Sequence, residues 1–143
     1  MKFSFLQKIT GLGGAPVGQV AGSGPPADAV RQLLAELPEL LLAAVLDSSS
    51  GEVRAALAST RHYQPAAIAA PVLAMARQLQ ALQATQGQAP DALSEVVLTL
   101  TTQLHVLRPA PDGQHLLYLA VDARDTNLAI ARQVAAEAAE LLR

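Results

Sequence analysis

Cysteine is absent from the 143 residues, and aromatic side chains make up only 3% of them. Without cysteine, the chain can form no disulfide and offers no thiolate as nucleophile or metal ligand. So few rings provide little surface on which nucleic-acid bases could stack. Ten lysines and arginines against twelve acidic residues give a net charge of −2, without the basic stripe of a nucleic-acid-binding domain. We therefore expect no nucleic-acid partner.

Long hydrophobic runs are missing as well. The most apolar stretch, residues 40–46, is far shorter than the roughly 20 residues that span a bilayer. Near the N-terminus, Lys2 and Lys8 enclose only the short apolar run 3–6, which is a poor match to a secretory signal. These features favour a soluble cytoplasmic protein that does not insert into a membrane.

Aliphatic residues are abundant: 51% of the chain is hydrophobic and 15% is charged. This composition argues against disorder, and the length suits one domain. Six of the nine glycines lie in the first 24 residues, and Pro25 and Pro26 follow them. We expect a flexible tail over residues 1–25 and a folded domain over residues 26–143, because a glycine-rich segment loses much entropy on folding.

The periodicity of the apolar residues predicts helix, two strands, helix, three strands, helix. The expected strands span residues 40–46, 52–58, 94–101, 103–108 and 115–121. Asp47 to Gly51 and Asp112-Gly113 provide turn residues. We expect the last helix to be capped by Asp125 or Thr126. The fold class is α+β, with a five-stranded antiparallel sheet and helices packed on it.

The second predicted helix, residues 66–86, carries a narrow apolar stripe. Its members recur at steps of four, three, four and three: Ile68, Val72, Met75, Leu79 and Leu82. Pro71 either kinks this helix or delays its regular hydrogen bonding, and Gly87 should end it. Such a stripe can pack against the sheet, or it can lie partly exposed in the groove of a dimer.

Motifs for nucleotide binding and nucleophilic catalysis are weak. Residues 11–14 lack the Lys-Ser/Thr ending of a phosphate-binding loop. The serines at 48–50 stand before Gly51 without a Gly-x-Ser-x-Gly elbow, and turn chemistry explains them more simply. We assign no catalytic residue and no cofactor, although a small enzyme with an unrecognised pocket is a third reading.

Metal and acid–base sites are equally weak. His105 and His115 fall on adjacent predicted strands, on the order of 13 Å apart, which is too far for one shared metal ion. Asp122 and Asp125 are better explained as turn and N-cap residues than as a general acid and base. No metal site is expected.

One predicted strand is suited to association. In residues 94–101, Thr99 and Thr101 alternate with apolar residues, and Glu95 is the only charge. A strand of this kind at a sheet edge attracts another strand, since little blocks its backbone groups.

The element order and several local patterns resemble the roadblock/LC7 family over residues 27–143. The resemblance rests on the first strand with its Asp-x-x-x-Gly turn (residues 40–51), the alanine-rich helix 66–86, the strand meander with Asp112-Gly113, and residues 125–132. It implies a homodimer joined through strand 94–101 and the second helix. The interface residues it implies are Val96, Leu98, Leu100, Ile68, Val72, Met75 and Leu79.

The resemblance further implies a non-catalytic regulatory or adaptor module that binds a small Ras-like GTPase and modulates its nucleotide cycle. Bacterial gliding-motility regulators of the family act in this way, and eukaryotic members serve as dynein light chains. Arg54, Arg61 and Arg77 are candidates, by exposure alone, for an arginine supplied to the partner. The alternative is a structural dimerisation scaffold for a non-GTPase assembly, with Phe3 and Phe5 as a possible anchor.

Overall fold

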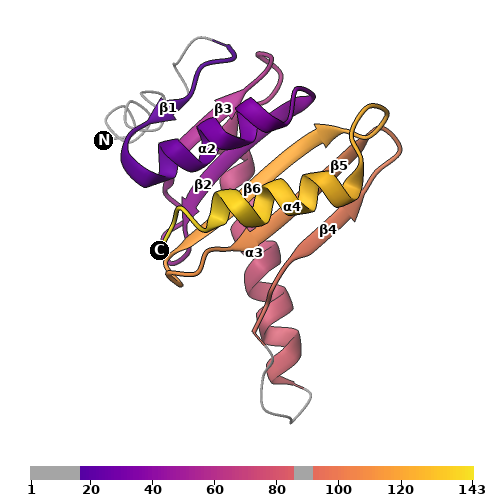
Figure 1. Cartoon of the computed structure of the whole chain (residues 1–143). Helices are drawn as coiled ribbons and strands as arrows, with labels where there is room; N and C mark the ends of the chain where they lie inside the picture. The colour runs from indigo at the N-terminus through magenta and orange to yellow at the C-terminus, as the bar shows by residue number, and fades with distance from the viewer. Residues whose placement is uncertain (1–16, 86–91) are drawn as a thin grey trace.

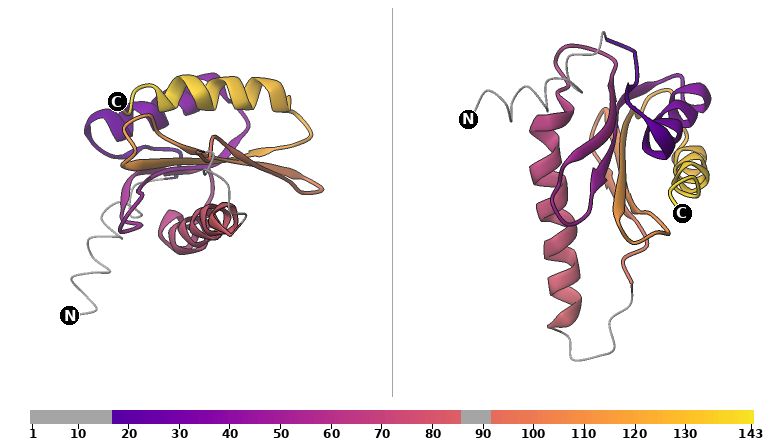
Figure 2. Two further views of the ribbon diagram at one scale, coloured as in Figure 1. Left: turned by 90° about the horizontal axis from the view of Figure 1, so that it is seen from below. Right: turned by 90° about the vertical axis from the view of Figure 1, so that its left-hand side faces the viewer.

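The computed structural model describes residues 17–85 and 92–143. A six-stranded antiparallel sheet has α2 and α4 on one face and α3 on the other (Figures 1 and 2). In chain order the elements are β1 (Ala21–Gly22), α2 (Gly24–Glu36), β2 (Leu40–Asp47), β3 (Val53–Ala58), α3 (Pro65–Ala84), β4 (Val96–Thr99), β5 (Gln103–Pro109), β6 (His115–Asp122) and α4 (Leu128–Ala139). The strand order is β1-β3-β2-β6-β5-β4.

The two central strands, β2 and β6, are apolar along nearly their whole length because helices cover both faces of the sheet. They pair antiparallel from Leu40 opposite Val121 to Asp47 opposite His115. One core lies between the sheet and α2 with α4, and a second lies under α3. Small residues on the buried side of α4, among them Ala131 and Ala135, give it a flat face toward the first core.

The prediction of an α+β fold with an antiparallel sheet is confirmed, but the sheet has six strands rather than five. The additional strand, β1, places Ala21 opposite Ala56 and Gly22 opposite Ala55. Two residues are too few to show an alternating pattern, so periodicity could not reveal this strand. The structured region also begins before residue 26, since Pro25 and Pro26 lie in the first turn of α2, where proline is tolerated.

Two details of the other helices differ from expectation. The N-cap of α4 is Asn127, not Asp125 or Thr126, and its Oδ1 accepts a hydrogen bond from the Ala129 amide at 2.8 Å. Helix α3 continues through Pro71, whose side chain is exposed. Gly87, expected to end that helix, lies outside the described residues, as do the glycines at 11–14. In the described ranges, none of the helices combines the length and apolar character that crossing a bilayer requires.

Candidate association surface

Strand β4 forms one edge of the sheet. It pairs with β5 alone, from Val96 opposite Leu107 to Thr99 opposite Leu104. The side chains of Leu98 and Leu100 are 42% and 53% exposed. Apolar side chains beside unpaired backbone groups make this edge a template for another strand.

The outer half of α3 adds further apolar side chains, at the end of the sheet where the β2–β3 turn lies and Arg77 donates to the Ser49 carbonyl. Figure 2 shows α3 extending beyond the end of the sheet on the face opposite α2 and α4. Leu82, near the end of α3, is 56% exposed and Leu79 is half-buried, while Met75 is half-buried against the core under α3. Val96 packs into the core beneath α3, so Leu98 and Leu100, two and four residues further on, point to the same side. We call β4 with Leu100, together with Met75, Leu79 and Leu82, the association surface.

The seven residues predicted for a dimer interface do not share one environment. Leu98 and Leu100 are exposed, while Val96, Ile68, Met75 and Leu79 are half-buried. Val72 is only 4% exposed and belongs to the core under α3, so it is not available to a partner. The apolar stripe of α3 is therefore divided: its first half packs on β2 and β3, and its last turns extend past them.

A network of hydrogen-bonded polar side chains lies on β5 and β6, next to β4. Gln103 Nε2 donates to Tyr63 Oη at 3.0 Å, and Gln103 Oε1 lies 2.9 Å from His105 Nε2. His105 Nδ1 is 2.5 Å from Tyr118 Oη. Burial lowers the pKa of His105 and raises the pKa of Tyr118 to about 12. These contacts suit a neutral imidazole that donates through Nε2 and accepts the Tyr118 proton at Nδ1, which occupies both ring nitrogens.

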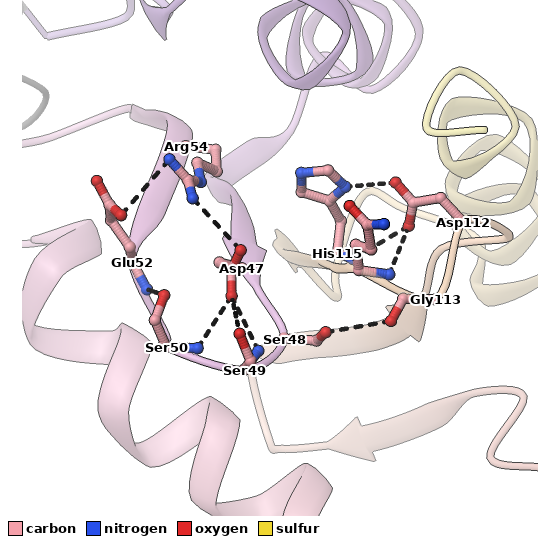
Figure 3. A network of polar contacts seen from close by, with 10 residues as sticks. Asp47, Ser48, Ser49, Ser50, Glu52, Arg54, Asp112, Gly113 and His115 are labelled. Atoms are coloured by element: carbon pink, nitrogen blue, oxygen red, sulfur yellow. Dashed lines mark hydrogen bonds and ion pairs between the residues drawn. The ribbon is translucent and has the colours of Figure 1, made fainter.

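The serine run after β2 has a structural role (Figure 3). Asp47 Oδ1 accepts hydrogen bonds from the Ser49 amide, the Ser50 amide and the Ser49 hydroxyl at 3.0, 2.9 and 2.7 Å. The Ser48 amide donates to the Gln114 carbonyl at 2.8 Å, which joins this turn to the one before β6. The serines therefore hold two turns together, and the Ser49 hydroxyl is engaged by the carboxylate of its own turn.

The turn before β6 is organised in a similar way. Asp112 accepts from the amides of Gln114 and His115 and lies 2.5 Å from His115 Nδ1. Burial raises the pKa of Asp112, but the hydrogen bonds from the Gln114 amide and the His115 ring outweigh it, so the net pKa is lowered.

His105 lies opposite Ala120, which places it five residues along β6 from His115. Among the described residues, no three His, Cys, Asp or Glu side chains come together as a metal site.

Asp47 should make folding pH-dependent. The Ser49 hydroxyl, together with the Ser50 and Ser49 amides, holds the pKa of Asp47 well below its ordinary 3.8. A lowered folded-state pKa adds stability that is complete above the unfolded pKa and is lost as the pH falls through the folded pKa.

We expect Asp47→Ala to lose about 1–2 kcal/mol of unfolding free energy at neutral pH. Below about pH 4 its unfolding free energy should decline less steeply with falling pH than that of the wild type. Ser49→Ala should be intermediate, because both amide donors remain. Urea unfolding across pH measures this, and parallel curves for wild type and Asp47→Ala would contradict it.

Most of the charged side chains considered for binding form ion pairs or hydrogen bonds with other residues of the chain. Glu95 accepts from Arg108 Nη1 at 2.8 Å and from Arg132 Nε at 2.5 Å, so it ties the start of β4 to β5 and α4. It does not lie within the exposed stretch 98–100. Of the three arginine candidates, Arg54 pairs with Asp47 and Glu52, Arg77 donates to the Ser49 carbonyl, and Arg61 is exposed.

No family model and no curated protein matches the sequence, whereas several solved structures match the fold. The gliding protein MglB from Thermus thermophilus is 23% identical with a TM-score of 0.69, over 90% of this chain and 95% of that one. An MglB described as having a tetrameric arrangement is also 23% identical, with a TM-score of 0.68 over 90% and 94%. A roadblock/LC7 domain from Streptomyces avermitilis is 18% identical, with a TM-score of 0.68 over 79% and 90%. The chain therefore has the fold of the roadblock/LC7 family.

Proposed function

We propose that this chain is a non-catalytic module that works as a homodimer. Two observations carry the proposal: the unpaired edge of β4, where Leu98 and Leu100 are exposed, and the overhanging end of α3, where Leu82 is exposed. Antiparallel pairing of β4 with β4 of a second copy continues the sheet across a twofold axis and keeps both α3 helices on one face. Each copy then covers the exposed leucines of the other.

The lack of a catalytic role is supported by the polar groups. Both ring nitrogens of His105 and the Nδ1 of His115 have partners, and the carboxylates of Asp47 and Asp112 accept from their own turns. These groups are engaged in contacts that hold turns and strands of the described structure, which favours a structural role for them.

The partner we propose is a small Ras-like GTPase, as the family resemblance implies and as the likeness to a gliding protein favours. Arg54 and Arg77 are occupied within the chain, so we favour a mechanism in which this module binds one nucleotide state more tightly and shifts the population toward it. Each tenfold preference corresponds to about 1.4 kcal/mol.

The test is capture of small GTPases encoded by the same genome on the immobilised chain, each loaded with GDP or with a non-hydrolysable GTP analogue. We expect one GTPase to be retained, with at least about a tenfold preference for one state. A chain that forms the dimer but retains none of them in either state contradicts the GTPase proposal and favours the scaffold alternative, which predicts no change in GTP hydrolysis.

A further inference from the structure

The edge of the sheet opposite β4 is closed by a short segment of the chain's own N-terminal region. Without β1, strand β3 would be the outermost strand. Ala21 and Gly22 pair with Ala56 and Ala55, and the Gly18 amide donates to the Ala58 carbonyl at 2.9 Å. Residues 18–22 thus lie along β3, beside the start of α2 (Figure 1).

Strand β3 carries little that would protect it as a free edge. Its six residues, Val-Arg-Ala-Ala-Leu-Ala, contain no proline and one charge. That charge, Arg54, is engaged by Asp47 and Glu52. Natural sheets protect exposed edges with charges, prolines or bulges, or by covering them. In this chain β3 is protected because β1 covers it. The small alanine side chains of β3 allow another backbone to approach closely.

The sequence of residues 18–22 fits the position of this segment beside β3. A Cβ at Gly22 would lie 2.4 Å from the Arg54 carbonyl oxygen and 2.9 Å from Ala55 Cα, and the φ of Gly22 is +103°. Only glycine satisfies both constraints. Val20 packs against the core beneath α2 and α4, and Ala21 is buried. The segment is therefore anchored by apolar contacts as well as by its backbone pairing.

We infer that β1 restricts assembly to the β4 edge by closing β3, and that the surface it covers fits β3 of a second copy of this chain. This inference rests on the proposed dimer through β4. One self-complementary edge produces a closed twofold dimer, whereas two such edges on one subunit produce an open linear assembly. Opening β3 should therefore convert a dimer into a series of larger species.

The primary test is Gly22→Val in the full chain, compared with wild type by light scattering over a range of concentrations. We expect a weight-average mass at least about twice that of wild type, rising with concentration. Val20→Asp is the second variant, because it removes the apolar anchor without a clash or a strained φ. Gly113→Ala is the matched control: Gly113 also has a positive φ, +70°, but open space surrounds it and it lies in the β5–β6 turn.

Combination with Leu98→Lys separates edge opening from misfolding. Leu98→Lys blocks β4, so Gly22→Val with Leu98→Lys should form a discrete dimer through β3, whereas aggregates of misfolded chains would persist in both backgrounds. Gly22→Val and Val20→Asp proteins with a native unfolding transition and the mass of wild type would overturn the inference. So would large species that Leu98→Lys leaves unchanged.

The same measurements distinguish this inference from the proposed function. A wild-type monomer would contradict the dimer through β4. In that case the inference still predicts that Gly22→Val forms a closed dimer, because β3 would be the only edge available.

Discussion

Replacing Leu98 by lysine is expected to convert the dimer into a monomer. Leu98 is exposed in one copy, and pairing through β4 would bury it in both. A lysine there places an unpaired charge in the interface twice, at a cost of several kcal/mol for each copy. The dissociation constant should therefore rise by roughly a thousandfold or more, measured by sedimentation velocity over a dilution series.

The matched control is Ile130→Lys. Ile130 is 52% exposed, an exposure similar to that of Leu98, but it lies on α4, on the opposite face of the sheet from α3. It should leave the dissociation constant within a few-fold of wild type. If Leu98→Lys remains a dimer with the wild-type constant, β4 is not the interface.

The largest loss of stability is expected for Leu119→Ala. Leu119 is fully buried on β6, between Ala43 of β2 and Val106 of β5, in the core beneath α2 and α4. Truncating a leucine in such a place costs about 2–5 kcal/mol, because the cavity left behind closes only in part. That is a large share of the roughly 5–15 kcal/mol that stabilises a domain of this size.

Leu82→Ala is the comparison for Leu119→Ala. Leu82 is largely exposed at the end of α3, so its truncation should change the unfolding free energy of the separated chain by less than about 0.5 kcal/mol. Urea unfolding at one fixed protein concentration, in the Leu98→Lys background, removes the contribution of association. Equal losses for the two variants would contradict the assignment of Leu119 to the core.

Much of the architecture could be predicted from local patterns. Strands β2 and β6 are apolar runs because both of their faces are covered, and Gly51 and Gly113 adopt the positive φ that their turns require. The N-cap of α4 was harder to predict, because Asp125, Thr126 and Asn127 are all good N-cap residues. Only the path of the folded chain places the Asn127 side chain where it accepts a hydrogen bond from the Ala129 amide.

The candidate surface was predicted in part. The alternation in residues 96–100 identified Leu98 and Leu100, and both are exposed. The spacing on α3 could not separate Val72, which is in the core, from Leu82, which is in solvent. Periodicity reports which side of a helix is apolar, but how far that helix extends past the sheet depends on the sheet's own length and position.

The sequence by itself determined the order of the elements that follow β1, the α+β class and the apolar character of the β4 edge, because each follows from residues close together along the chain. The tertiary structure alone decided that β1 closes the β3 edge, that α3 extends beyond the sheet, and that the polar groups of the turns bind one another. These features depend on pairings such as Gly22 with Ala55 and Ser48 with Gln114. Residues so far apart in sequence leave no local pattern, since their contact exists only once the chain has folded.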